Sequence, residues 1–210
     1  MNLLTRGIAV SLILLCSAAR SAGPDVDALI PRLARLPPAT IAFTEARFSA
    51  LLREPVIVAG EVSYLGPGSF ERRVTLPYRE TTAIHGESVR IEREGEASRT
   101  FGLKRAPELG GLLSGFAALL SGDAAAVARE FSVASTGDEK SWALELTPLT
   151  RNDRRRLRQI LVSGAESETR CFAVVSEQGS ASVMLLGSAA EQPIAGDATL
   201  DALLRRCRVE

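Results

Sequence analysis

Residues 56–103 read VIVAGEVSYLGPGSFERRVTLPYRETTAIHGESVRIEREGEASRTFGL, and this stretch decides the fold. Its apolar side chains fall on alternate positions, as at Val58, Val62 and Tyr64, and glycine-rich breaks such as residues 66–68 separate the alternating runs. Successive side chains on a strand point to opposite faces of a sheet, so alternate apolar positions share one face. The stretch therefore predicts an antiparallel meander with one apolar and one polar face. Another part of the chain must cover the apolar face.

The length and composition of the chain are those of one globular domain. It has 210 residues, and 46% of them are hydrophobic, which is enough to build a proper core. Its 25 basic and 25 acidic residues balance to a net charge of zero. General nucleic-acid binders normally carry a basic excess, so we expect no nucleic-acid partner. We expect a monomer.

The N-terminus has the pattern of a secretory signal. Arg6 precedes an apolar run over residues 7–17, and small residues follow that run. A membrane anchor is the alternative, but the run is too short to span a bilayer comfortably. We therefore predict a signal peptide over residues 1–22, cleaved near residues 19–22, and one exported domain over residues 23–210.

Two cysteines, Cys171 and Cys207, remain after cleavage of that signal. Exported proteins fold in oxidising compartments, where such a pair invites a disulfide. The alternative is two unpaired, buried thiols. The sequence leaves both possibilities open.

Helical and extended patterns flank the central meander. Residues 25–36 have apolar side chains at helical spacing, and residues 40–52 have the pattern of a long strand. Residues 109–120 carry a broad apolar stripe on a glycine-rich helix without a charged outer face. This stripe is either ordinary core or one wall of an apolar ligand site. Strands resume after residue 131, and residues 198–206 again have helical spacing.

The sequence offers little catalytic chemistry. His85, the single histidine, lies in a predicted turn, and no nucleophile elbow, phosphate-binding glycine loop or zinc motif is present. We therefore expect no enzyme activity, no metal and no cofactor. A run of arginines either docks an acidic partner or is a solvated surface; it comprises Arg151, Arg154, Arg155, Arg156 and Arg158.

The order of short motifs resembles that of the LolA/LolB family of periplasmic lipoprotein carriers. Residues 43–45 (Phe-Thr-Glu) lie in the first long strand, and the pattern Gly60-x-Val62-x-Tyr64-x-x-Pro67-x-x-Phe70 follows. A proline turn at Pro77 and an apolar helical insertion complete the likeness over roughly residues 25–190. The resemblance implies a mainly β fold: an incomplete, strongly curved antiparallel β-barrel with a helical lid over an apolar cavity. LolA has an arginine before the motif proline that helps lock its lid, and this chain has Gly66 there.

The resemblance also implies a function and a set of site residues. A periplasmic carrier of this kind takes the acyl chains of a lipoprotein, or of another lipid-like cargo, from an inner-membrane export complex to an outer-membrane acceptor. The alternatives are a structural or interaction module of the cell envelope with a self-filled core, and an accessory protein in lipid export. The expected cavity residues are Phe43, Val58, Val62, Tyr64, Phe70, Val74, Leu76, Ile84, Val89, Ile91, Leu144 and Leu146. The expected lid residues are Leu109, Leu112, Leu113, Phe116 and Leu120.

Overall fold

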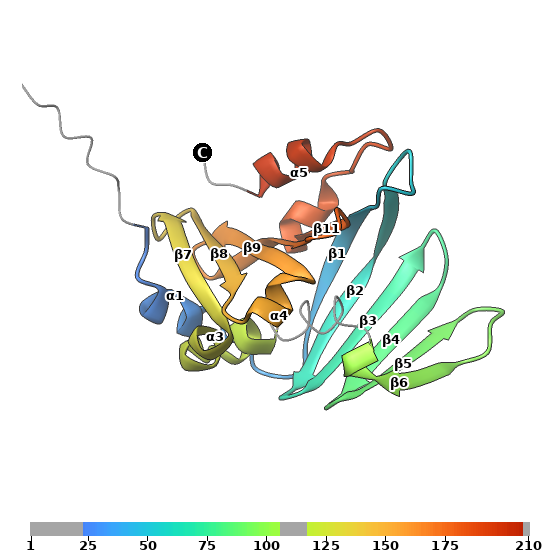
Figure 1. The fold of residues 1–210 in the computed structure, drawn as a ribbon, viewed down its shortest axis with the longest axis horizontal. Helices are drawn as coiled ribbons and strands as arrows, with labels where there is room; N and C mark the ends of the chain where they lie inside the picture. Colours follow the sequence, from blue (N-terminus) through green and yellow to red (C-terminus); the bar gives the residue numbers. More distant parts are fainter. Residues whose placement is uncertain (1–22, 106–116, 208–210) are drawn as a thin grey trace, which may run out of the picture.

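A computed structural model describes residues 23–105 and 117–207. The strands in these ranges form one antiparallel sheet in the order β6-β5-β4-β3-β2-β1-β11-β10-β9-β8-β7. The sheet is curved but not closed, because β6 and β7 form its two free edges (Figure 1). The strands are β1 (Ala39–Phe48), β2 (Val56–Gly66), β3 (Ser69–Leu76), β4 (Glu80–His85), β5 (Ser88–Arg93), β6 (Arg99–Gly102), β7 (Phe131–Gly137), β8 (Trp142–Pro148), β9 (Leu157–Ala165), β10 (Glu168–Ser176) and β11 (Ala181–Leu186).

The predicted meander corresponds to β2–β6, in which each strand pairs with the next. Tyr64 pairs with Phe70, Phe70 pairs with Ile84, and Ile84 pairs with Val89. Because directly paired residues share a face, this row of side chains lies on one side of the sheet, which we call the concave face. The predicted mainly β fold with an incomplete, curved barrel is confirmed.

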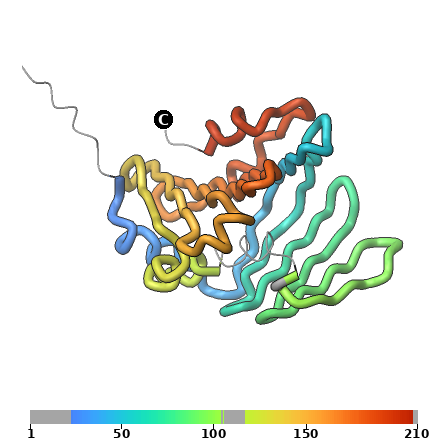
Figure 2. The backbone as a smooth tube through the Cα atoms, viewed as in Figure 1, coloured from blue at the N-terminus to red at the C-terminus, as the bar shows by residue number. Residues whose placement is uncertain are grey.

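The two halves of the sheet meet where β1 pairs with β11. These strands come from opposite ends of the sequence and run side by side through the middle of the molecule (Figure 2). Their register pairs Phe43 with Leu186, and Met184 of β11 pairs in turn with Phe172 of β10. The concave face therefore continues without a break from the meander into β7–β11.

Helices cover one end of the concave face. The helix α1 (Val26–Arg32) begins at Asp25, whose carboxylate caps it, and packs against α3 (Ala124–Glu130). Residues 117–121 are also helical, and Leu119 is buried with the apolar side chains of α1. The predicted lid residues Leu109, Leu112, Leu113 and Phe116 lie outside the described residues.

Two predicted elements end earlier in the structure. The expected helix over residues 25–36 stops at Arg32, and Leu36 beyond it is 90% exposed. The expected strand over residues 40–52 stops at Phe48. Phe48 is out of phase with Phe43 because the strand is apolar on both sides, and Phe48 packs against a second core on the convex face.

No helix in the described ranges has the length and the apolar character that spanning a membrane requires.

That second core lies between the sheet and the C-terminal helix α5 (Leu200–Arg206). Thr199 caps α5, and Leu203 of this helix is buried against Val183 and Leu185 of β11. The short elements η1 (Leu103–Arg105), α4 (Arg151–Arg154) and η2 (Gly187–Glu191) complete the chain. The second core explains why β10 and β11 are apolar on both faces: the barrel interior lies on one side and α5 on the other.

A disulfide joins α5 to the sheet. Cys171 of β10 and Cys207 at the end of α5 are bonded, with their Cα atoms 5.4 Å apart. Both residues are buried in the second core. The sequence left open a disulfide or two unpaired thiols, and the structure has the disulfide.

Replacing both cysteines by alanine is expected to lower the free energy of unfolding by about 3–4 kcal/mol, as chain entropy predicts for residues 36 positions apart. Urea unfolding can be followed by the fluorescence of Trp142, the single tryptophan, which is fully buried. The oxidised wild type should unfold at a higher urea concentration than the Cys171→Ala/Cys207→Ala variant. Equal midpoints would show that the bond does not contribute to stability.

Candidate ligand-binding site

Most of the predicted cavity residues lie on the concave face and are buried in its core. They are Phe43, Val58, Val62, Tyr64, Phe70, Val74, Ile84, Val89, Leu144 and Leu146, with Ile91 partly buried beside them. Packing alone accounts for side chains such as Phe43 and Leu146, which leave no surface free. Their role in binding a ligand stays a prediction.

The prediction for Leu76 is wrong. Its side chain is 64% exposed. Gly60 pairs with Val74 and Ala59 pairs with Leu76, so Thr75 is an extra residue in β3. Such a bulge changes the alternation of faces. Leu76 therefore shares the convex face with Ala59, although it is two positions from the buried Val74.

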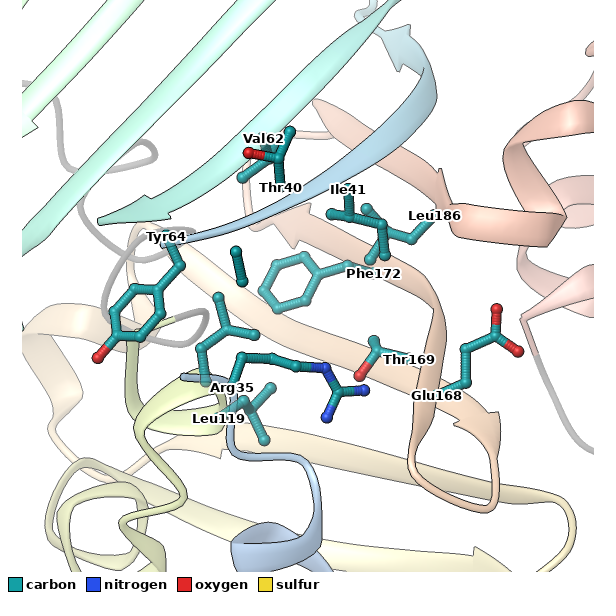
Figure 3. Close-up of a pocket in the computed structure, with 12 residues that line it drawn as sticks. Arg35, Thr40, Ile41, Val62, Tyr64, Leu119, Glu168, Thr169, Phe172 and Leu186 are labelled. Atoms are coloured by element: carbon teal, nitrogen blue, oxygen red, sulfur yellow. The ribbon is translucent and has the colours of Figure 1, made fainter. Parts of the chain in front are cut away.

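An apolar pocket of about 150 Å³ lies between the concave face and the helical cover. Figure 3 shows the Phe172 ring among the side chains that line it, with the Tyr64 hydroxyl pointing away from them. Apolar side chains form most of the wall, and Arg35, Thr40, Glu168 and Thr169 form a polar rim. The apolar lining residues are Ala39, Ile41, Val62, Tyr64, Leu119, Leu120, Phe172 and Leu186.

Two hydrogen bonds donated by Arg35 hold the rim of this pocket. The backbone N–H of Arg35 donates to the carbonyl of Leu120 at 2.9 Å, which ties the segment after α1 to the helical residues 117–121. The Arg35 guanidinium donates to the carbonyl of Ser167 in the β9–β10 turn. Of the predicted lid residues, Leu120 is the one within the described residues, and it lines the pocket.

The opposite end of the concave face is charged. Glu45 is only 3% exposed, and its carboxylate accepts hydrogen bonds from Arg72, from Arg47 (Nε, 3.0 Å) and from the hydroxyl of Ser182. The Arg72 guanidinium also lies 4.7 Å from the centre of the Phe43 ring. Glu80 extends the group and forms an ion pair with Arg93, with a nitrogen–oxygen distance of 2.7 Å. We call these residues the ionic cluster: Glu45, Arg47, Arg72, Glu80 and Arg93.

Charge pairing keeps Glu45 ionised. Burial alone raises the pKa of its carboxyl, but the guanidinium groups of Arg72 and Arg47 and the hydrogen bonds from Arg47 and Ser182 outweigh burial. The pKa of Glu45 therefore lies below its ordinary value. Both arginines remain protonated at any physiological pH.

Because its pKa is lowered, Glu45 makes the free energy of unfolding depend on pH in the acid range. The unfolded chain binds a proton at Glu45 near the ordinary pKa of 4.5, whereas the folded protein does so only at lower pH. The stabilisation from Glu45 is therefore complete above about pH 4.5 and is lost as the pH falls through the folded-state pKa. On acidification, the wild type should lose more of its free energy of unfolding, measured with urea, than Glu45→Met/Arg72→Met, which lacks the Glu45 carboxylate. Equal losses would contradict this role of Glu45.

A second, larger cavity of about 480 Å³ borders the ionic cluster. Residues of β1, β3 and β4 form its charged wall, including Glu45, Arg47, Arg72 and Glu80. Leu157, Val174 and Ala181 line it from the other half of the sheet. Its volume lies within the range of about 300–1,000 Å³ that is usual for small-molecule sites. We call it the charged cavity.

Comparison with known proteins identifies the family. The model of a family described as "Outer membrane lipoprotein carrier protein LolA-like" matches residues 18–209. The chain belongs to this LolA-like family. No curated protein sequence matches the chain.

Two solved structures are similar to this LolA-like protein at low identity. A LolA superfamily protein from Nitrosomonas europaea is 11% identical, with a TM-score of 0.38 over 76% of this chain and 89% of its own. A putative outer membrane lipoprotein-sorting protein domain from Vibrio parahaemolyticus is 9% identical, with a TM-score of 0.41 over 88% of this chain and 97% of its own.

The ionic cluster of this LolA-like chain was not among the predicted site residues, although the sequence contains a signal of it. Arg72 has the same phase as Phe70 and Val74, and Glu45 has the same phase as Phe43. A charged residue in the apolar phase of a strand must be paired if the face is buried. Two such residues of opposite charge on neighbouring parts of one sheet indicate a buried ion pair.

The predicted docking arginines lie around α4. Arg151, Arg154, Arg155, Arg156 and Arg158 are all exposed. Arg154 donates to the carbonyl of Pro148 at 2.6 Å, and Arg156 lines the charged cavity. Docking of a partner protein by these arginines stays a prediction.

His85 lies at the end of β4, and its Nδ1 is 3.3 Å from the hydroxyl of Ser69. Among the described residues, no group of three or more histidine, cysteine, aspartate or glutamate side chains could hold a metal ion. The residues brought together on the concave face of this LolA-like protein are suited to binding, through apolar contact and charge.

Proposed function

We propose that this LolA-like protein is a periplasmic, non-enzymatic carrier of an acylated cargo, either a lipoprotein or another lipid-like molecule. It takes the cargo from an inner-membrane export complex and delivers it to an outer-membrane acceptor. The proposal includes cleavage of the export signal over residues 1–22 and a single, monomeric domain over residues 23–210.

The apolar pocket supports this proposal most directly. Apolar side chains of the concave face and of the helical cover surround a space of about 150 Å³ that they leave unfilled. Apolar cavities of such a size stay dry and accept apolar molecules. Each buried methylene contributes about 0.8 kcal/mol, so a partly enclosed chain end is already held measurably.

A carrier must also release the cargo that it binds. The pocket lies at the boundary between the sheet and its helical cover, where the hydrogen bond from Arg35 to Leu120 joins two separate segments. Separating these segments would enlarge the pocket without breaking the pairing of strands. Loops and helices that open in this way commonly control entry and release of a bound molecule.

An interaction module with a self-filled core is the second candidate. The observation that favours it is the complete burial of Phe43, Leu144 and Leu146, which fill much of the concave side themselves. In this case the apolar pocket would be a packing defect, and the exposed arginines near α4 would dock a partner.

A transfer assay distinguishes the two functions. Donor vesicles carry a fluorescent diacylated peptide, and its arrival in acceptor vesicles is measured with increasing amounts of the mature protein. A carrier should raise the transfer rate in proportion to its concentration. A rate that never exceeds spontaneous transfer would favour the interaction module.

A further inference from the structure

The charged cavity combines two kinds of wall. Its charged wall belongs to β1, β3 and β4, and its apolar wall includes Leu157 of β9 and Val174 of β10. Ser176, Ser180 and Ser182 also line the cavity. A molecule that fills this cavity must therefore be polar at one end and apolar at the other.

The acceptor sites of Glu45 are already occupied. Both carboxylate oxygens of Glu45 accept hydrogen bonds, from Arg47, Arg72 and Ser182. One oxygen of Glu80 accepts from Nε of Arg93 at 3.0 Å and forms an ion pair with Nη2 of Arg93 at 2.7 Å. A carboxylate offers about four acceptor sites, and Glu45 uses them all.

Donors, by contrast, are left over. Arg72 is 8% exposed, and its Nε is the one buried side-chain nitrogen or oxygen without a hydrogen-bond partner in the described part of the chain. Nη1 of Arg72 is 3.9 Å from Glu80, beyond hydrogen-bond distance. Three arginines line the cavity: Arg47, Arg72 and Arg156. The carboxylates of Glu45 and Glu80 also line it, so the wall carries one positive charge in excess.

We propose that the charged cavity binds the anionic headgroup, a carboxylate or a phosphate, of an amphiphilic cargo. This inference rests on the carrier function proposed above and assigns a specificity to it. The arginines bind the anionic oxygens, and the apolar wall formed by Leu157, Val174 and Ala181 contacts the first part of the acyl chain. Buried arginines suit this role, because their planar groups bind such anions with directed hydrogen bonds.

Three amphiphiles with one chain length test the proposal. Laurate carries a carboxylate, dodecyl phosphate carries a phosphate, and monolaurin is neutral. Their dissociation constants for the mature, disulfide-bonded protein are measured by isothermal titration calorimetry below the critical micelle concentration of each. We expect at least one anionic amphiphile to bind about tenfold more tightly than monolaurin or better, and their order distinguishes a carboxylate site from a phosphate site.

Matched variants show whether the preference for anionic amphiphiles arises in the charged cavity. Arg156→Gln removes an exposed positive charge from the cavity wall, and Arg155→Gln removes a neighbouring exposed charge that does not line it. We expect Arg156→Gln to reduce the preference for anions about threefold or more, and Arg155→Gln to leave it unchanged.

The outcomes separate this inference from the carrier function. Equal wild-type affinities for the three amphiphiles, or the same loss with both single arginine variants, would overturn the headgroup site and leave the carrier function intact. If the wild type binds none of the three, the carrier function itself fails. Circular dichroism of each variant shows whether a loss of binding reflects a loss of the fold.

Discussion

Glu45→Gln is expected to lower the free energy of unfolding by about 3–5 kcal/mol, the usual effect of removing one partner from a buried ion pair. The Glu45 carboxylate is buried, and Arg72 opposite it is 8% exposed. Without the carboxylate, the positive charge of Arg72 stays in the barrel interior with only Glu80, 3.9 Å away, to balance it. Urea unfolding at neutral pH, followed by Trp142 fluorescence, measures the change.

Glu92→Gln provides the matched control. Glu92 pairs with Arg90 on the same sheet, but both side chains are at least half exposed. Exposed ion pairs contribute about 0–1 kcal/mol, so this variant should unfold almost like the wild type. Glu45→Met/Arg72→Met should recover at least half of the stability lost in Glu45→Gln, because apolar side chains replace both buried charges. If Glu45→Gln and Glu92→Gln cost the same, the ionic cluster is not a buried structural element.

Ile41→Glu is expected to weaken binding of an acylated ligand about 100-fold or more, because a carboxylate in an apolar pocket is costly to desolvate. Ile41 lines the apolar pocket beside Phe172 and Leu186 (Figure 3). It is only partly buried, so the variant is expected to fold. Titration of the protein with a fluorescent fatty acid, with circular dichroism as a test of folding, measures the effect.

Leu65→Glu is the control for this experiment. Leu65 follows Tyr64 in β2, so its side chain lies on the opposite face of the sheet, and it is exposed. The same substitution there should leave the ligand affinity unchanged. Equal weakening by both variants would indicate a general effect of added negative charge and would contradict a ligand site in the apolar pocket.

The sequence predicted the meander because apolar residues keep one phase in its alternating runs, as at Val62 and Tyr64 before the glycine-rich break and at Phe70 and Val74 after it. The bulge at Thr75 escaped prediction, because an extra residue is defined by the pairing of β3 with β2 and leaves no mark in the alternation itself. Leu76 was therefore placed on the wrong face.

Local periodicity predicted the apolar part of the candidate site, and it marks Glu45 and Arg72 as charged residues in an apolar phase without showing that they meet. Tyr64 and Val62 have the right phase, and both line the apolar pocket. The ionic cluster depends on Glu45 and Arg72, which are 27 positions apart and meet because β1, β2 and β3 pair in one register. Pairing of β1 with β11 adds Ser182, 137 positions from Glu45. Such long-range registers follow from the whole fold and cannot be read from local periodicity.

Native mass spectrometry of the protein, purified from cells without detergent, tests the carrier function most directly. The account predicts a second species whose added mass dissociates on activation and, after organic extraction, is identified as an acyl-bearing molecule. Ile41→Glu, prepared in the same way, should lack this species, and Leu65→Glu should retain it. Wild-type protein that is always empty, and that also fails to take up added acylated molecules, would contradict the account.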